Sequence, residues 1–319
     1  VSRESGLLIN NLLLVVATLV VFVGTMWPLM IETFTGRKVS VGAPFFDAAF
    51  TPFMVALAAI LPLFATLPWK RGDLRRAMGP LWGALALSVA LGAFVWASQT
   101  GGAMLAPVGV TLAAWLVLGS AAEIAARTRL GRAPFGETLR RARNLPRADW
   151  GKAVAHAGFG ATILGVACVT AWESEDIRVL RVGESFAAGG YELTLDAVER
   201  REGPNWVADV ALLAVARDGR PIGVLAPEKR VYPVQGMPTT EAAIDRSLRR
   251  DLYVTLGDPQ ADGAWAVRTY LRPYVNWIWI GALIMAAGGA ISLADRRYRV
   301  GAPAARRPGV AAARVAPAE

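Results

Sequence analysis

The stretch WGKAVAHAGFGATILGVACVTAW, residues 150–172, decides the fold of this chain. Residues 153–172 carry no formal charge, and about 20 such residues are enough for one helix to cross the hydrocarbon core of a membrane. His156 lies inside this run and is the only histidine among the 319 residues. The sequence therefore predicts a membrane-spanning helix with a single imidazole inside it.

The composition extends this prediction to the whole chain. Hydrophobic residues make up 54% of the sequence and the mean hydropathy is +0.39, values typical of an integral membrane protein. The net charge of +9 comes from basic residues that cluster in short segments between apolar runs, as in cytoplasmic loops, so we expect no nucleic-acid partner. Cys168 is the only cysteine, which excludes an intramolecular disulfide, a zinc site and a CxxC redox pair.

Uncharged apolar runs predict six spanning helices, five of them in residues 1–172. The expected helices lie at about 7–30, 48–69, 79–98, 103–124, 150–172 and 273–295. We expect no acidic residue in the interior of these helices.

Residues 173–272, between the fifth and sixth helices, have the composition of a soluble domain. Several segments alternate or are rich in β-formers, and Asp218-Gly219 between two apolar segments is a hairpin signal. We therefore expect an α-helical bundle of six transmembrane helices with an inserted extracytoplasmic β-rich domain, which is a sandwich or a barrel. The Ala/Pro/Arg-rich tail, residues 296–319, is expected to be disordered.

The basic segments also predict the orientation in the membrane. Segments 70–76, 127–152 and 295–307 are strongly basic, so all three are expected on the cytoplasmic side. Six helices then alternate without conflict, with both termini cytoplasmic and the β-domain on the opposite side. His156 is expected nearer the cytoplasmic end of its helix.

The residues alone give His156 two interpretations. An imidazole in hydrocarbon costs free energy unless it has a partner, so it indicates a functional site, with haem iron or a proton path as candidates. The Gly/Ala series at 157–165 would then let a flat or bulky group approach the helix. Alternatively, His156 bonds to a neighbouring helix and the small residues are ordinary membrane-helix packing.

The β-domain has neither histidine nor cysteine, which excludes the usual transition-metal sites and Cys- or His-dependent catalysis. Its densest polar stretch includes Glu228, Lys229, Arg230 and Glu241. These residues either form weak ion pairs in a solvated loop or contact a partner protein. A β-domain tethered between two spanning helices suggests a docking role, and strand addition at an open edge is one physical route.

Six strings, in order along the chain, carry a family resemblance. They are SRESGLLINNLLL (2–14), RKVSVGAPFF (37–46), AHAGFG (155–160), PEKRVYPVQGMPTTEAAI (227–244), DLYVTLG (251–257) and WIWIGALIMAAGGAISLADRRYR (277–299). Together they resemble the second half of the CcmF family, the haem lyase component of cytochrome c maturation in bacteria and mitochondria.

The resemblance implies a function and a set of partners. In this family a membrane haem b is held by two histidines from different spanning helices, and His156 matches the second of them. The haem b is thought to reduce the iron of an incoming haem that the haem chaperone CcmE carries. Subunits of the CcmH/CcmI type present apocytochrome c, and its CxxCH thiols join the haem as thioethers. The resemblance also implies the bacterial inner membrane and a periplasmic β-domain.

The chain also departs from the family pattern. The other haem-b histidine, two periplasmic histidines and a tryptophan-rich WWD segment lie in the family's first half, which is not in this sequence. Alone, the chain offers one axial ligand, so we expect it to be part of a haem lyase and not a complete enzyme. The sequence does not begin with Met, which fits a fragment or one subunit of a split protein.

Two alternatives belong to other functional classes. One is a haem-free membrane scaffold whose β-domain recruits assembly partners. The other is a transporter subunit, which would need intramembrane charges or broken helices arranged as paired repeats. The chain shows no evident repeat.

Overall fold

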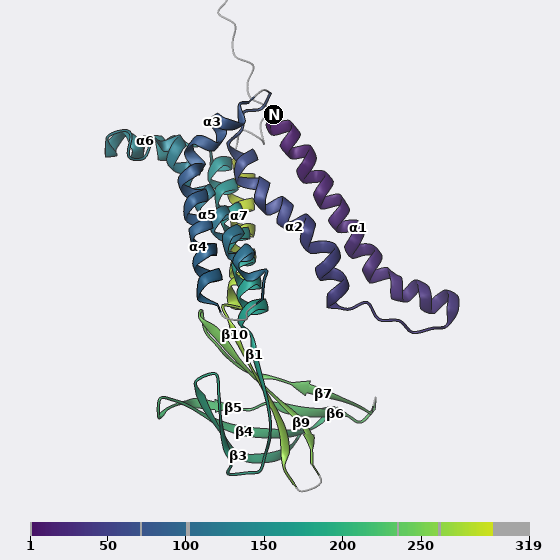
Figure 1. Ribbon diagram of the computed structural model, residues 1–319. Helices are drawn as coiled ribbons and strands as arrows, with labels where there is room; N and C mark the ends of the chain where they lie inside the picture. Colours follow the sequence, from purple (N-terminus) through teal and green to yellow (C-terminus); the bar gives the residue numbers. More distant parts are fainter. Residues whose placement is uncertain (1, 71, 100–102, 235, 261–262, 296–319) are drawn as a thin grey trace, which may run out of the picture.

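The computed structural model describes residues 2–70, 72–99, 103–234, 236–260 and 263–295 (Figure 1). A helical bundle lies at one end of the molecule and a β-domain at the other (Figure 1). The helices are α1 (Arg3–Thr35), α2 (Ala43–Thr66), α3 (Leu74–Met78), α4 (Trp82–Ser98), α5 (Ala106–Thr128), α6 (Phe135–Asn144), α7 (Arg147–Trp172) and α8 (Asn276–Leu293). A 3-10 turn, Gly79–Leu81, joins α3 to α4. The expected disordered tail, 296–319, lies outside the described residues.

Six helices of the described chain are long and apolar enough to cross a membrane. They are α1, α2, the continuous segment Leu74–Ser98, α5, α7 and α8. This confirms the predicted class of a six-helix membrane protein. The structure adds α6, a short helix inside the basic segment between the fourth and fifth spanning helices.

Local chemistry fixes the ends of the first helix. The Ser2 hydroxyl accepts a hydrogen bond from the Ser5 N–H at 3.1 Å and caps α1. Gly36, with φ 67°, ends the helix, and its N–H donates to the Glu32 carbonyl at 2.9 Å.

The second helix, α2, contains Pro62, which cannot donate a backbone hydrogen bond to the preceding turn. Trp115 of α5 donates its indole N–H to the Ala59 carbonyl in that preceding turn, at 2.9 Å.

Glycines set the spacing between α7 and its neighbours. A Cβ placed on Gly158 would lie 2.6 Å from the Met285 backbone nitrogen of α8, and one on Gly160 would lie 2.8 Å from the Ala113 carbonyl of α5. Gly151 and Gly165 approach α8 in the same way. The glycines of the series therefore serve helix packing of the kind found in membrane bundles, as the second interpretation expected, and they do not leave room for a flat ligand on those faces.

The β-domain is a sandwich of two antiparallel sheets. The strands are β1 (Ser174–Leu180), β2 (Ser185–Ala188), β3 (Tyr191–Glu202), β4 (Val207–Arg217), β5 (Arg220–Leu225), β6 (Glu228–Tyr232), β7 (Met237–Glu241), β8 (Ala243–Arg246), β9 (Arg250–Pro259) and β10 (Trp265–Pro273). One sheet has the order β1-β10-β9-β8 and the other β2-β3-β4-β6-β7, with β5 also paired to β4. Between them lies a fully buried core that includes Leu193, Leu213 and Val254.

Two features connect this domain to the sequence and to the membrane. Asp218 and Gly219 both have positive φ, 51° and 72°, so the predicted hairpin between β4 and β5 is confirmed. The strand β1 follows α7 directly and pairs antiparallel with β10, which leads into α8. The sandwich therefore stands on a two-stranded stem that continues α7 and α8 (Figure 1).

Candidate functional site

The side chain of His156 opens into a cavity between α7, α1 and α2. The cavity has a volume of about 230 Å³. It is lined by Arg3, Gly6, Leu7 and Asn10 of α1, by Ile60, Leu61, Phe64 and Ala65 of α2, and by Lys152 and His156 of α7. The histidine therefore faces a space that three helices enclose, while Gly158 on the same helix packs against α8.

The cavity combines apolar walls with two cations. Leu7, Leu61 and Phe64 supply apolar surface, while Arg3 and Lys152 contribute positive charge beside the imidazole. His156 is half-buried, and no hydrogen bond to its ring is seen within the part of the chain that the structure describes. The structure thus places the imidazole at the wall of a partly apolar space, with no hydrogen-bond partner among the described residues.

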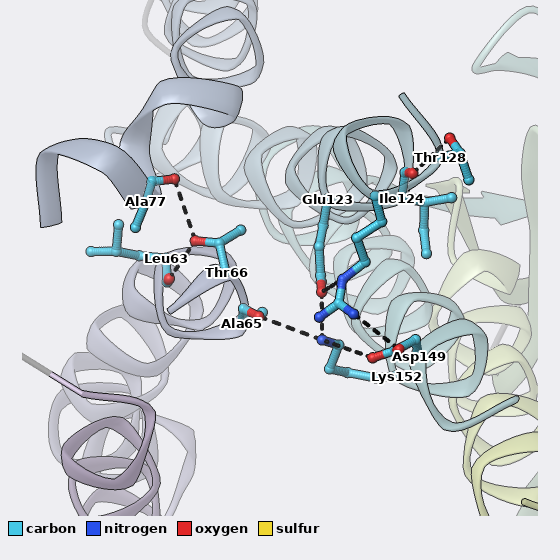
Figure 2. Close-up of polar contacts among 10 residues, drawn as sticks. Leu63, Ala65, Thr66, Ala77, Glu123, Ile124, Thr128, Asp149 and Lys152 are labelled. Carbon is cyan, nitrogen blue, oxygen red and sulfur yellow. Dashed lines mark hydrogen bonds and ion pairs between the residues drawn. The ribbon is translucent and has the colours of Figure 1, made fainter. Parts of the chain in front are cut away.

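A partly buried ionic cluster, centred on the buried Glu123, adjoins the cavity, one helical turn from His156. The Lys152 ammonium donates to Glu123 Oε1 at 2.5 Å and lies 3.9 Å from Asp149 Oδ1. Arg127 joins the same carboxylates, at 3.0 Å from Glu123 and 2.9 Å from Asp149. Figure 2 shows the Lys152 ammonium below the Glu123 carboxylate, with Asp149 on one side and the Ala65 carbonyl of α2 on the other, the latter at 3.5 Å.

The position of Glu123 corrects an expectation from the sequence. This carboxylate is only 3% exposed and lies within α5, which ends at Thr128 and not near 124. The prediction that no acidic residue lies inside a spanning helix was therefore wrong. A buried carboxylate is costly unless cations compensate it, and Lys152 and Arg127 do so here.

The charges around the cavity do not balance among themselves. Arg3, Arg127 and Lys152 are three cations, and Glu123 and Asp149 are two carboxylates. Arg3 is held at the cavity edge by its backbone N–H, which donates to the Pro68 carbonyl at 2.9 Å. One positive charge is left over, so this end of the cavity suits an anionic group.

Asp295 connects α8 to the start of α7. It is 5% exposed, and its Oδ2 accepts a hydrogen bond from the Ala148 N–H at 3.0 Å. A carboxylate at a helix N-terminus satisfies an unpaired backbone donor and interacts favourably with the helix dipole. This contact fixes the end of α7 that carries Lys152 and His156.

The polar stretch of the β-domain forms strands and not a loop. Glu228, Lys229 and Arg230 lie in β6, which pairs with β7, and Glu228 stands opposite Glu241. Arg230 contacts Glu228 at 2.7 Å, and Lys229 forms an ion pair with Asp258. The hydrogen bond to Glu228 raises the pKa of Arg230 above its usual value. Both cations thus have partners within the domain, as the ion-pair interpretation expected.

A hollow of about 480 Å³ lies on the other sheet of the sandwich. Arg272 lies over the rings of Tyr253 and Tyr270, at 4.6 and 5.0 Å from their centroids. The edge of the hollow includes Ile177 of the end strand β1, which is 51% exposed. Sequence reasoning missed this hollow because the residues that line it come mainly from four strands, β1, β7, β9 and β10.

Comparisons with known proteins agree on one family. A family model described as the CcmF C-terminal beta-sandwich matches residues 171–273. The cytochrome c-type biogenesis protein ccl1 of Rhodobacter capsulatus is 54% identical over 306 residues, which are 96% of this chain and 46% of that protein. The cytochrome c-type biogenesis protein CcmF of Escherichia coli is 38% identical over 300 residues, or 93% of this chain and 44% of that protein.

A solved structure supports the same relationship. The structure titled Cytochrome c Heme Lyase CcmF matches with a TM-score of 0.67 and 25% identity. The match covers 92% of this chain and 46% of that chain. The chain therefore spans about half the length of the relatives it matches.

Proposed function

Since the chain belongs to the CcmF family of cytochrome c-type biogenesis proteins, as its C-terminal half, we propose that it is the haem-handling part of a cytochrome c haem lyase. Its relatives act in cytochrome c biogenesis, which supports a role in cytochrome c maturation. The finer proposal is that His156 is one axial ligand of a membrane haem b. The N-terminal half of CcmF would supply the other ligand.

The cavity at His156 is the observation that carries this proposal. A neutral imidazole is a common axial ligand of haem iron, and the ring faces the cavity without a hydrogen-bond partner among the described residues. Leu7, Leu61 and Phe64 offer apolar surface to a macrocycle, and the positive charge left over at the cavity edge, where Arg3 lies, can pair with one of its carboxylates. When bound, haem b supplies a one-electron couple for reducing the iron of an incoming haem.

The size of the cavity supports a site shared with another polypeptide. At about 230 Å³ it is smaller than the roughly 300–1,000 Å³ of ordinary small-molecule pockets. Figure 1 shows α1 diverging from the bundle, and its large apolar side chains Leu8, Leu12 and Phe22 are 60–71% exposed. A second membrane segment that packs on α1 would complete the walls and bring the missing ligand.

The proposed protein partners would meet the β-domain on the extracytoplasmic side of the membrane. The β-domain lies at the end of the bundle opposite the basic loops, so in the bacterial inner membrane it would be periplasmic, with both termini cytoplasmic. There it would meet the haem chaperone CcmE, CcmH/CcmI-type subunits and apocytochrome c. Each CxxCH thiol adds across a haem vinyl group, and its hydrogen ends on the neighbouring carbon, so no atom leaves.

The test uses this chain together with the N-terminal half of CcmF. The variant His156→Ala should lower the haem content of the purified assembly at least severalfold and remove the low-spin b-type spectrum. Val154→Ala, two residues away on the same helix, is the matched control and should retain both. In a His156→Gly variant, added imidazole should restore the spectrum if the ring acts as a ligand.

Two outcomes would contradict the proposal. An unchanged haem content and spectrum in His156→Ala would exclude this histidine as a ligand. A lost spectrum that imidazole does not restore, in an assembly that still forms, would assign the histidine a structural role only.

The haem-free scaffold remains a second candidate, favoured by the hollow that Tyr253, Tyr270 and Arg272 form on the β-domain. It predicts that Arg272→Ala weakens capture of the CcmH-type partner while His156→Ala changes nothing. If the histidine variant alone impairs haem attachment, the scaffold interpretation fails.

A further inference from the structure

Helix α6 has one apolar face and one basic face, and neither is used by the site described above. Phe135, Leu139 and Ala142 recur at the spacing of one helix face, Arg143 lies at the border of that face, and Arg140 lies on the other side. Phe135 is 79% exposed and Leu139 is 40% exposed. Such a helix in water would leave apolar surface unburied, so its surroundings must supply a partner.

The orientation of α6 points to the membrane surface. Figure 1 shows α6 crosswise to α4, α5 and α7, at the end of the bundle opposite the β-domain. Because the spanning helices run across the membrane, a helix crosswise at their end lies in the plane of its surface. The Trp150 indole N–H donates to the Ala142 carbonyl at 3.2 Å and ties α6 to the first turn of α7.

The charge of α6 selects the kind of surface. Arg140 and Arg143 are exposed and enter none of the ion pairs seen among the described residues, whereas Arg141 pairs with Glu137 at 2.6 Å. Leu130, just before the helix, adds a further apolar side chain that is 61% exposed. Arginines beside an apolar face are the pattern of helices that lie in a headgroup layer and attract anionic lipid.

We propose that α6 is an interfacial helix that binds anionic phospholipid headgroups of the membrane that the bundle spans. Phe135 and Leu139 insert at the boundary between headgroups and acyl chains, and Arg140 and Arg143 contact lipid phosphates. The helix thereby anchors the basic connection between α5 and α7, the two helices that carry Glu123 and Lys152.

The first test measures the depth of the two faces in the full chain. In a Cys168→Ala background, which removes the only cysteine, an environment-sensitive fluorophore is attached at Phe135→Cys or, as matched control, at Asn144→Cys on the polar face. In vesicles of phosphatidylcholine and phosphatidylglycerol, lipid brominated near the carbonyl should quench the label at 135. Aqueous iodide should quench the label at 144. Equal quenching of both labels by iodide would overturn the proposal.

The second test measures lipid selectivity at the same label. Brominated phosphatidylglycerol should quench the label at 135 more strongly than brominated phosphatidylcholine. The preference should fall about fivefold for each arginine removed in Arg140→Gln/Arg143→Gln. The control Arg200→Gln/Arg220→Gln, on the exposed surface of the β-domain, should leave it unchanged.

Two results would count against lipid as the occupant. An unchanged preference in the α6 variant would remove the role of the arginines. Protection of the label at 135 from both iodide and brominated lipid, seen only when the N-terminal half of CcmF is present, would assign this face to a protein interface.

Discussion

Helices α6 and α7 follow one another in the chain, separated only by Leu145 and Pro146, yet their charges have opposite surroundings. In α7, Lys152 is 16% exposed and its ammonium meets the buried carboxylate of Glu123. In α6, the pair of Glu137 and Arg141 is about one-third exposed and surrounded by further arginines. The same basic segment therefore places one ion pair where neighbouring helices exclude most solvent and another where solvent reaches both partners.

The two helices also differ in how they use neighbours. α7 is wedged between α5 and α8 by glycines at close approach, so its position is fixed from two sides. α6 buries only Thr138 against the bundle and leaves Phe135 open. A ligand that needs fixed geometry, such as the haem proposed at His156, suits the first environment, and a fluid lipid surface suits the second.

The largest effect is expected from the buried pair of α5 and α7. Glu123→Met leaves the Lys152 ammonium in the bundle without its nearest carboxylate, so the free energy of unfolding should fall by about 3–5 kcal/mol. The double variant Glu123→Met/Lys152→Met replaces the pair by apolar side chains of similar volume and should recover most of that loss. Reversible unfolding in mixed detergent micelles measures both.

An exposed pair supplies the control for this experiment. Glu199 and Arg201 in the β-domain are 49% and 47% exposed, so Glu199→Met should cost no more than about 1 kcal/mol. If Glu123→Met and the double variant were equally unstable, the two charges would not be coupled, and burial would not distinguish α7 from α6.

A smaller effect is expected from the glycine contact that positions α7. A Cβ at Gly288 of α8 would lie 2.5 Å from the Ala155 backbone nitrogen, so Gly288→Ala should destabilise the bundle by about 1–3 kcal/mol. Gly289, the next residue, has nothing within 4 Å of such a Cβ. Gly289→Ala should therefore be neutral or stabilise by up to about 1 kcal/mol.

Thermal unfolding of the two alanine variants, side by side, measures this difference. Both variants add one methyl group to a glycine of α8. The gain in helix propensity is therefore the same in both, and the difference between their unfolding midpoints reports the contact of residue 288 with α7. Equal midpoints would mean that α7 and α8 can separate slightly at no cost, and that α7 is as loosely held as α6.

The membrane class of this protein could be predicted from the sequence because long apolar runs have few alternatives. The hairpin at Asp218 and Gly219 could be predicted because only residues that tolerate positive φ suit such a turn. Helix α6 was missed because its apolar face is short and its arginines resemble a loop.

The candidate site was less predictable. His156 stands out in the sequence as a lone imidazole, but the cavity beside it is formed by Arg3 and Phe64, about a hundred or more positions away. The series at 157–165 carries no information on which face of α7 meets which neighbour, so the sequence left both interpretations open, and the structure shows that Gly158 packs on α8. Glu123 was overlooked because a single carboxylate near the expected end of a helix shows no sign of being buried.

The smallest expected effect concerns pH and the exposed pair of α6. The hydrogen bond and charge of Arg141 hold the pKa of Glu137 below its usual value, so the folded helix favours the ionised carboxylate. A depressed pKa contributes stability that is fully present above the unfolded pKa and is lost as the pH falls through the folded pKa. Amide hydrogen exchange at residues 135–144, corrected for its intrinsic pH dependence, should therefore quicken slightly below about pH 4, the usual range of a glutamate. Glu137→Gln should show no such step. If the step were as large as the loss in Glu123→Met, solvent would not be screening the α6 pair, and the contrast between the two helices would have another cause.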